Sequence, residues 1–290
     1  MFRKYLVFMC TGVLLTVMSA TPTWAESLLD AVKRGDATAV RALLTHGANP
    51  NRDDRYGYTT PLFEAAQYGH IDVALLLLAH GANPNRTTNN GDTPLSGAAT
   101  SGHANMVKIL LEHGAKTNQA NKQGDAPLFE AALYGIDQYP ALIMIRVFKL
   151  LLAHGANINQ TDKNGWSPYS EVVRGGHTAF LKLLLAHGAN PNQVFYGGLT
   201  PLGLAAQTGH LSEVKLLLAH KANPNKSYQG GLTPLIEAAQ YGYVNVVQIL
   251  LDHGADINHV FKNYTTALFE AKEEGNEDVV KLLKSYGAKQ

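Results

Sequence analysis

Apolar and polar residues recur along the chain in a pattern that predicts pairs of short helices. The clearest pair lies between Thr60 and Asn83. Thr60 suits a helix N-cap, and Pro61 suits the first helical position because its missing N–H would be unpaired there. An apolar run over residues 71–78 follows and predicts a second helix. Gly81 can adopt a positive φ and end that helix.

The same pattern recurs at a nearly constant period. A helix pair of this kind exposes more apolar surface than it can bury alone, so it needs copies of itself on both sides. The helix-opening proline recurs in steps of 33, 33, 41, 33 and 33 residues, at Pro61, Pro94, Pro127, Pro168, Pro201 and Pro234. The helix-ending glycine recurs at Gly47, Gly81, Gly114, Gly155, Gly188, Gly254 and Gly287, and Lys221 stands where another is expected.

These repeated motifs resemble the ankyrin repeat, whose signature contains T-P-L-H, A-A and G-H and ends with L-L-L…G-A-D/N-x-N. The resemblance covers residues 27–289 and implies an all-α solenoid of stacked helix–turn–helix units with β-hairpin-like fingers. One departure is systematic, because the His of T-P-L-H is replaced in every unit. The replacements are Phe63, Ser96, Phe129, Ser170, Gly203, Ile236 and Phe269.

The resemblance divides the chain into eight units. Residues 26–54 predict an N-terminal capping unit, residues 55–260 predict six full repeats, and residues 261–290 predict a C-terminal capping unit. The full repeats, numbered here as units 2 to 7, start near Arg55, Thr88, Asn121, Asp162, Phe195 and Tyr228.

Unit 4 carries eight extra residues near 137–144. Pro140 suits a first helical turn, so residues 141–144 are expected to lengthen the second helix by about two turns. Two interpretations stay open. The insertion is either a partner-binding protrusion or an addition whose apolar residues fold onto the adjacent repeats.

Residues 1–25 do not belong to the repeats. Arg3 and Lys4 precede an apolar run from Leu6 to Val17, and Ala25 ends the segment. This order predicts a secretory signal peptide. The alternative is a membrane anchor, but the run has 12 residues and spanning a bilayer takes about 20. Cleavage near Ala25 would remove Cys10, leaving a cysteine-free chain with no membrane span in a bacterial periplasm or outside the cell.

Charge and histidine content exclude several classes of site. Without Arg3 and Lys4, 22 basic residues remain against 23 acidic ones, so composition predicts no basic stripe for nucleic acid. Eleven of the 12 histidines occupy two repeated positions, one before the helix-ending glycine and one after the inter-helix glycine. Equivalent residues in stacked helices lie about 8–10 Å apart, too far to share one metal ion. A repeated structural role is therefore favoured, with no metal and no cofactor.

No catalytic motif is present. The sequence lacks G-x-S-x-G, a P-loop and H-E-x-x-H, and the exported chain would have no cysteine nucleophile. We therefore predict a non-enzymatic protein.

The remaining candidate for function is the surface. In the ankyrin family, the fingers and the exposed side of the first helices form a concave binding face. Carried over by position, the resemblance gives acidic and tyrosine sets on the first helices and aromatic residues on the fingers. The residues predicted to contact a partner are Glu64, Tyr68, Tyr134, Trp166, Tyr196, Glu237, Tyr241 and, on the insertion, Leu142.

Three further finger aromatics, Phe195, Tyr228 and Phe261, stand where the family often has Asp. They are either interface residues, which aromatic side chains often are, or rings that stack on one another along consecutive fingers as extra core.

The resulting prediction is a monomeric protein–protein interaction module of the periplasm, acting as a helper or scaffold for an envelope protein. An alternative is an immunity-type inhibitor of a toxin that acts in the periplasm. A third is a hydrolase with an unrecognised site, which would require convergent polar groups in a pocket.

Overall fold

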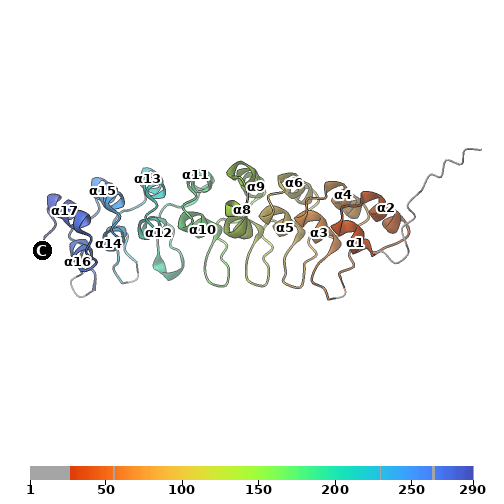
Figure 1. Ribbon diagram of the computed structural model, residues 1–290, viewed down its shortest axis with the longest axis horizontal. Coiled ribbons are helices and arrows are strands. Elements are labelled where there is room, and N and C mark those ends of the chain that lie inside the picture. Colours follow the sequence, from red (N-terminus) through yellow and green to blue (C-terminus); the bar gives the residue numbers. More distant parts are fainter. Residues whose placement is uncertain (1–26, 55, 229, 263–264, 290) are drawn as a thin grey trace, which may run out of the picture.

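The protein, described here from a computed structural model, is an elongated stack of helix pairs (Figure 1). The structure describes residues 27–54, 56–228, 230–262 and 265–289. The predicted signal peptide and Cys10 therefore lie outside the described residues. The first helices of the eight units are α1 (Leu28–Lys33), α3 (Pro61–Gln67), α5 (Pro94–Thr100), α7 (Pro127–Glu130), α10 (Pro168–Arg174), α12 (Pro201–Gln207), α14 (Pro234–Gln240) and α16 (Ala267–Glu273).

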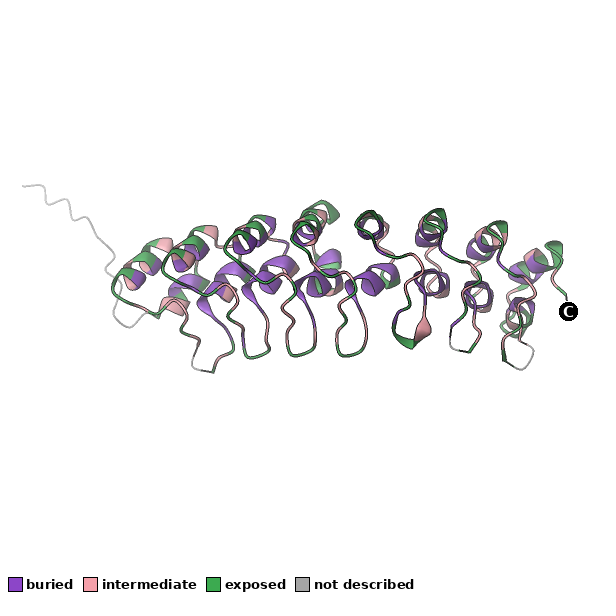
Figure 2. Ribbon diagram, turned by 180° about the vertical axis from the view of Figure 1, so that it is seen from behind, coloured by how far each residue is buried: buried purple, intermediate pink, exposed green. Residues whose placement is uncertain are grey.

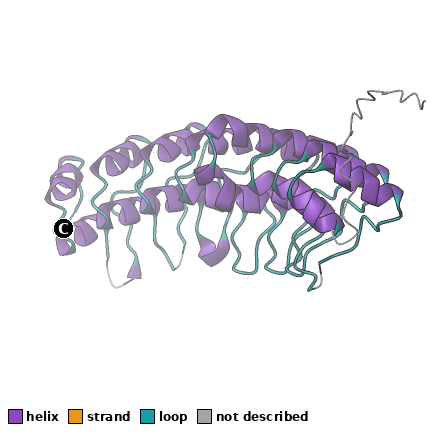
Figure 3. Cartoon of the chain, turned by 45° about the vertical axis from the view of Figure 1, so that its right-hand side comes forward, coloured by secondary structure: helices purple, strands orange, loops and turns teal. Residues whose placement is uncertain are grey.

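The second helices form a parallel row above the first, and the fingers extend from the side of the first row (Figures 1 and 3). Buried residues gather between the two rows (Figure 2). The second helices are α2 (Ala37–Thr45), α4 (Ile71–Ala79), α6 (Ala104–Glu112), α9 (Ala141–Ala153), α11 (Thr178–Ala186), α13 (Leu211–Ala219), α15 (Val244–Asp252) and α17 (Glu277–Ser285). This arrangement is the all-α solenoid that the repeats predict.

The described ranges contain no extended strand. Isolated bridges join Tyr228 to Leu232 and Phe261 to Thr265 within two fingers. No described helix is both long enough and apolar enough to cross a membrane.

The first helices begin as the sequence predicts. Thr60 Oγ1 accepts a hydrogen bond from the Phe63 N–H at 3.2 Å, and Pro61 occupies the first turn. In unit 5, Ser167 and Ser170 form a reciprocal capping box. Ala126 replaces the Thr in unit 4 and makes no side-chain capping bond.

Left-handed backbone ends the second helices. Gly81 has a φ of 85°, and Lys221 has a φ of 66° at the equivalent position in unit 6. The prediction that this position requires a positive φ is confirmed. Lys221 therefore carries the steric cost that glycine avoids.

Asparagines link one unit to the next. Asn85 Nδ2 donates to the Gly114 carbonyl at 3.0 Å, and its Oδ1 accepts from the Lys116 N–H at 2.7 Å. Asn51, Asn118, Asn192 and Asn225 make the same pair of bonds to their neighbouring units. These bonds satisfy backbone groups at the ends of the second helices.

The insertion lengthens the second helix less than the sequence suggests. Helix α9 has 13 residues where α6 and α11 have nine, so the extension is about one turn rather than two. Pro140 lies before the helix, as its N-cap, and not in its first turn. The remaining extra length is absorbed by a π-helical turn, η1 (Ala131–Gly135), and by α8 (Ile136–Gln138), which prolong the first helix.

Both interpretations of the insertion describe part of it. Met144 is fully buried and Ile136 is nearly so, which fits packing onto adjacent repeats. Met144 and its neighbours also cover Gly102 of the preceding unit. Leu142, by contrast, is 81% exposed.

The three unusual finger aromatics pack against the preceding unit. Phe195 meets Tyr169 edge-on with ring centroids 5.2 Å apart. Tyr228 is buried against Gly203, where a Cβ would lie 2.5 Å from the tyrosine ring. Phe261 lies beside Gly231 of the preceding finger. The first two rings are therefore core residues, as the second interpretation expects, but they pack on first helices and do not form a stack along the fingers.

Candidate protein-binding surface

The side of the molecule formed by the first helices and the fingers exposes a set of tyrosines. Tyr68 and Tyr241 are 56% and 51% exposed at the ends of their first helices, and Tyr134 is 49% exposed in the π-helical turn η1. Tyr196 is 72% exposed in the finger of unit 6, and Trp166 is partly buried in that of unit 5. These five sequence-predicted residues thus reach the surface from the first helices and the fingers.

Glu64 and Glu237 are placed differently from the prediction. Glu64 is 7% exposed and Glu237 is 3% exposed, so their carboxylates do not form an exposed acidic face. Helix spacing does place each glutamate on the same side of its helix as a tyrosine. The glutamates are nevertheless buried by neighbouring units, whereas the tyrosines stay exposed. Leu142 lies on α9 in the second row and is not brought together with the tyrosines.

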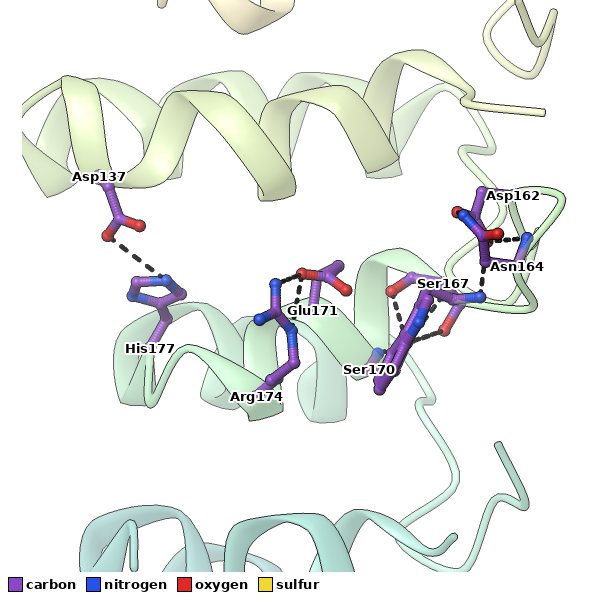
Figure 4. Close-up of polar contacts among 9 residues, drawn as sticks. Asp137, Asp162, Asn164, Ser167, Ser170, Glu171, Arg174 and His177 are labelled. Atoms are coloured by element: carbon purple, nitrogen blue, oxygen red, sulfur yellow. Dashed lines mark hydrogen bonds and ion pairs between the residues drawn. The ribbon is translucent and has the colours of Figure 1, made fainter. Parts of the chain in front are cut away.

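The buried glutamates are held by local partners. Glu64 lies 3.4 Å from Lys33 Nζ of the preceding unit. Glu171 accepts hydrogen bonds from Arg174, whose Nη2 lies 2.5 Å from its Oε2 (Figure 4). Arg174 also lies over the ring of Trp166, 5.8 Å from its centroid. Burial raises the pKa of Glu237, whose Oε2 accepts from Gln207 at 3.4 Å.

Units 3 and 4 form a group of three carboxyls that the sequence analysis missed. Asn121 Nδ2 lies 3.0 Å from Asp92 Oδ1, 3.3 Å from Asp125 Oδ2 and 3.2 Å from Glu130 Oε1. Burial, together with the charges of Asp92 and Asp125, raises the pKa of Glu130 to about 8. Burial also raises the pKa of Asp125.

These groups line a hollow of about 360 Å³ on the tyrosine side of the molecule. Phe63, Gln67 and Tyr134 also line it. The hollow therefore combines carboxyl oxygens with two aromatic rings, a combination that suits a cationic side chain. A sequence signal was present, since Gly-Asp precedes the first helix in two consecutive units, at residues 91–92 and 124–125.

Seven histidines complete the C-terminal ends of the second helices. In each case Nδ1 lies 2.7–2.9 Å from the carbonyl oxygen four residues earlier. A carbonyl can only accept, so Nδ1 carries the proton. The helix-end role is thereby confirmed for His46, His80, His113, His154, His187, His220 and His253.

The other repeated histidines lie between units. His70 Nε2 is 3.3 Å from the Lys33 carbonyl oxygen, and His103 Nε2 is 3.1 Å from that of Gln67. The insertion changes this contact in unit 5, where His177 Nε2 lies 3.6 Å from Asp137 (Figure 4). Across the described residues, no group of three or more His, Cys, Asp or Glu side chains is arranged to hold a metal ion.

Comparison with known proteins agrees with this architecture. The family described as "Ankyrin repeats (3 copies)" matches residues 25–88, 83–145, 141–228 and 214–290. A crystal structure of the human ASB11 ankyrin repeat domain is similar, with 30% sequence identity and a TM-score of 0.65. The match covers 78% of this chain and 98% of that one. No curated protein matched in the sequence comparison.

Ankyrin repeats mediate protein–protein binding and typically serve as non-catalytic scaffolds. The repeated sequence, the two rows of helices and the family match lead to one conclusion: this chain belongs to the ankyrin-repeat family.

Proposed function

We propose that the protein is an exported interaction module that binds another protein on the side formed by its first helices and fingers. In this proposal it acts in a bacterial periplasm, or outside the cell, as a helper or scaffold for an envelope protein. The partner places a cationic side chain in the hollow formed by units 3 and 4 and contacts the tyrosines on either side.

The observation that carries the proposal is the hollow with its flanking tyrosines. Asp92, Asp125 and Glu130 bring three carboxyls around one amide, at a cost in desolvation that stacking of repeats does not require. Tyr134 lines the hollow and is 49% exposed, and Tyr68, which follows the lining residue Gln67 in the sequence, is 56% exposed. Tyrosine is one of the residue types enriched among interface anchors.

Export is supported by the sequence of residues 1–25. The positive start, the short apolar run and Ala25 have the order of a signal peptide. Intact-mass measurement of the protein recovered from its own cells should show a chain beginning near Glu26. A full-length mass in the membrane fraction would contradict export.

The partner surface is tested by placing a photoreactive amino acid at Tyr134, which borders the hollow, and at Lys281 on α17 as a control. Crosslinking in intact cells should give one protein adduct from position 134, and Asp125→Asn should weaken it. Equal adducts from both positions would contradict the assignment. An enzyme or envelope component in the adduct would support the helper role, and a toxin would support the immunity-type alternative.

A further inference from the structure

The second row of helices carries a line of lysines on its outer side. Each lies five residues before the histidine that ends its helix, so the four occupy equivalent positions in consecutive units. The residues are Lys108 on α6, Lys149 on α9, Lys182 on α11 and Lys215 on α13, and all four are exposed. These helices contact one another in order. Helices in contact lie about 8–10 Å apart, so the row extends over about 25–30 Å.

Few acids neutralise this row. Lys108 lies 3.7 Å from Glu112, the exposed acid on these four helices. Glu213 is 2% exposed, and its Oε1 accepts from Thr178 Oγ1. Helices α9 and α11 contain no acidic residue. The nearly neutral composition of the whole chain conceals this local excess of positive charge.

The extra turn of α9 adds an apolar tip to the same surface. Pro140, Ala141, Leu142 and Ile143 are consecutive exposed residues. Leu142, Arg146 and Lys149 follow the spacing i, i+4, i+7 and therefore share one face of the helix. The same three residues line one shallow hollow. Asp137, the exposed acid beside the tip in sequence, lies 3.6 Å from His177.

We propose that this surface docks on an anionic lipid bilayer, with Leu142 and Ile143 entering the interface and the lysine row lying over the headgroups. The contact is separate from the partner surface on the first helices and does not depend on it. Charge complementarity favours a bilayer, because mobile anionic headgroups can diffuse to each of several separated lysines. Interfacial helices commonly combine such an apolar face with flanking lysines and arginines.

The proposal is tested with the chain from Glu26 onward, which contains every described helix and lacks the apolar run of residues 6–17. Partition is measured onto vesicles of phosphatidylethanolamine and phosphatidylglycerol at 3:1, and onto vesicles of phosphatidylcholine. Binding is expected on the anionic vesicles and is expected to weaken as salt is added.

Substitutions in the lysine row and at the tip of α9 test which residues contact the bilayer. Lys149→Gln should lower the partition coefficient about fivefold, and Lys149→Gln with Lys182→Gln about 25-fold. Leu142→Ser should also lower it. The matched controls are Lys163→Gln and Val194→Ser, which make the same chemical changes at exposed finger positions and should leave partition unchanged.

A second readout separates insertion from loose adsorption. An environment-sensitive fluorophore on a cysteine at position 142 should shift to the blue on anionic vesicles, and one at position 194 should not. The proposal is overturned by equal partition on the two lipids, by no effect of the lysine variants, or by a blue shift at position 194 alone. Binding of the row to an acidic protein with no binding to vesicles would also overturn it.

Discussion

The side-chain amide of Asn121 lies 3.2 Å from Glu130 Oε1 and, at the same time, 3.0 Å from Asp92 Oδ1. One uncharged donor therefore serves carboxyls from two neighbouring units. Burial disfavours the charge on Glu130, and the charges of Asp92 and Asp125 act in the same direction, so the protonated form is favoured and the pKa of Glu130 rises to about 8. The junction between units 3 and 4 is consequently sensitive to pH.

The first prediction concerns the dependence of folding stability on pH. The pKa of Glu130 is higher in the folded chain, at about 8, than its usual value of 4.5. The unfolded chain therefore releases this proton first as pH rises, and the stabilising contribution present below about pH 4.5 is lost progressively up to about pH 8. Glu130→Gln should melt higher than the wild-type protein at pH 8 and about equally at pH 4.5.

Thermal melts from pH 4 to pH 9 check this prediction. Glu112→Gln, at an exposed glutamate on α6, serves as the control and should follow the wild-type curve. A Glu130→Gln variant that is less stable than wild type at pH 8 would show that the ionised carboxylate stabilises the fold.

The second prediction concerns Lys221, whose φ of 66° is in the left-handed region. Lys221→Gly should stabilise the protein by about 1 kcal/mol, because glycine adopts this φ without the Cβ clash. The reverse change in the preceding unit, Gly188→Lys, should destabilise by a similar amount, since its φ is 86° and a Cβ there meets open space. Urea unfolding measures both. Effects of the same sign would contradict the backbone explanation.

The third prediction separates the two parts of the insertion. Met144 is fully buried, so Met144→Ala should cost about 2–5 kcal/mol of unfolding free energy. Leu142 is 81% exposed, and Leu142→Ala should change stability by no more than about 0.5 kcal/mol. Equal losses measured by chemical denaturation would mean that the whole insertion packs as core.

The fourth prediction concerns metal. The seven helix-end histidines donate through Nδ1 to backbone carbonyls, so their role requires no ion. Addition of a strong chelator should leave the thermal midpoint unchanged. A fall of several degrees that zinc restores would reveal a converging set of ligands.

The sequence predicted the features that recur in every repeat, namely the residues that begin and end the helices. Thr60, Pro61 and Gly81 follow from local backbone chemistry, and the strained Lys221 was recognised by comparison with equivalent positions.

The sequence could not predict features that depend on which neighbour covers a side chain. Glu64 and Tyr68 share a helix flank by spacing, yet the adjacent unit buries the first and leaves the second half exposed. The three carboxyls around Asn121 come from two units, so only the recurrence of Gly-Asp in consecutive units signals them, and nothing within one repeat does. The length of α9 depended on how a π-helical turn absorbs extra residues, which hydrophobic spacing does not report.

The most direct measurement of the central claim compares partner affinity with stability for Tyr68→Ala, Tyr196→Ala and Tyr241→Ala. If the partner binds the side of the first helices and fingers, the combined variant should lose at least about 2 kcal/mol of binding free energy and keep its melting midpoint. Leu75→Ala, at a 41% exposed leucine on the second row, should leave binding unchanged. Variants that melt early yet bind normally in the folded fraction would contradict the account.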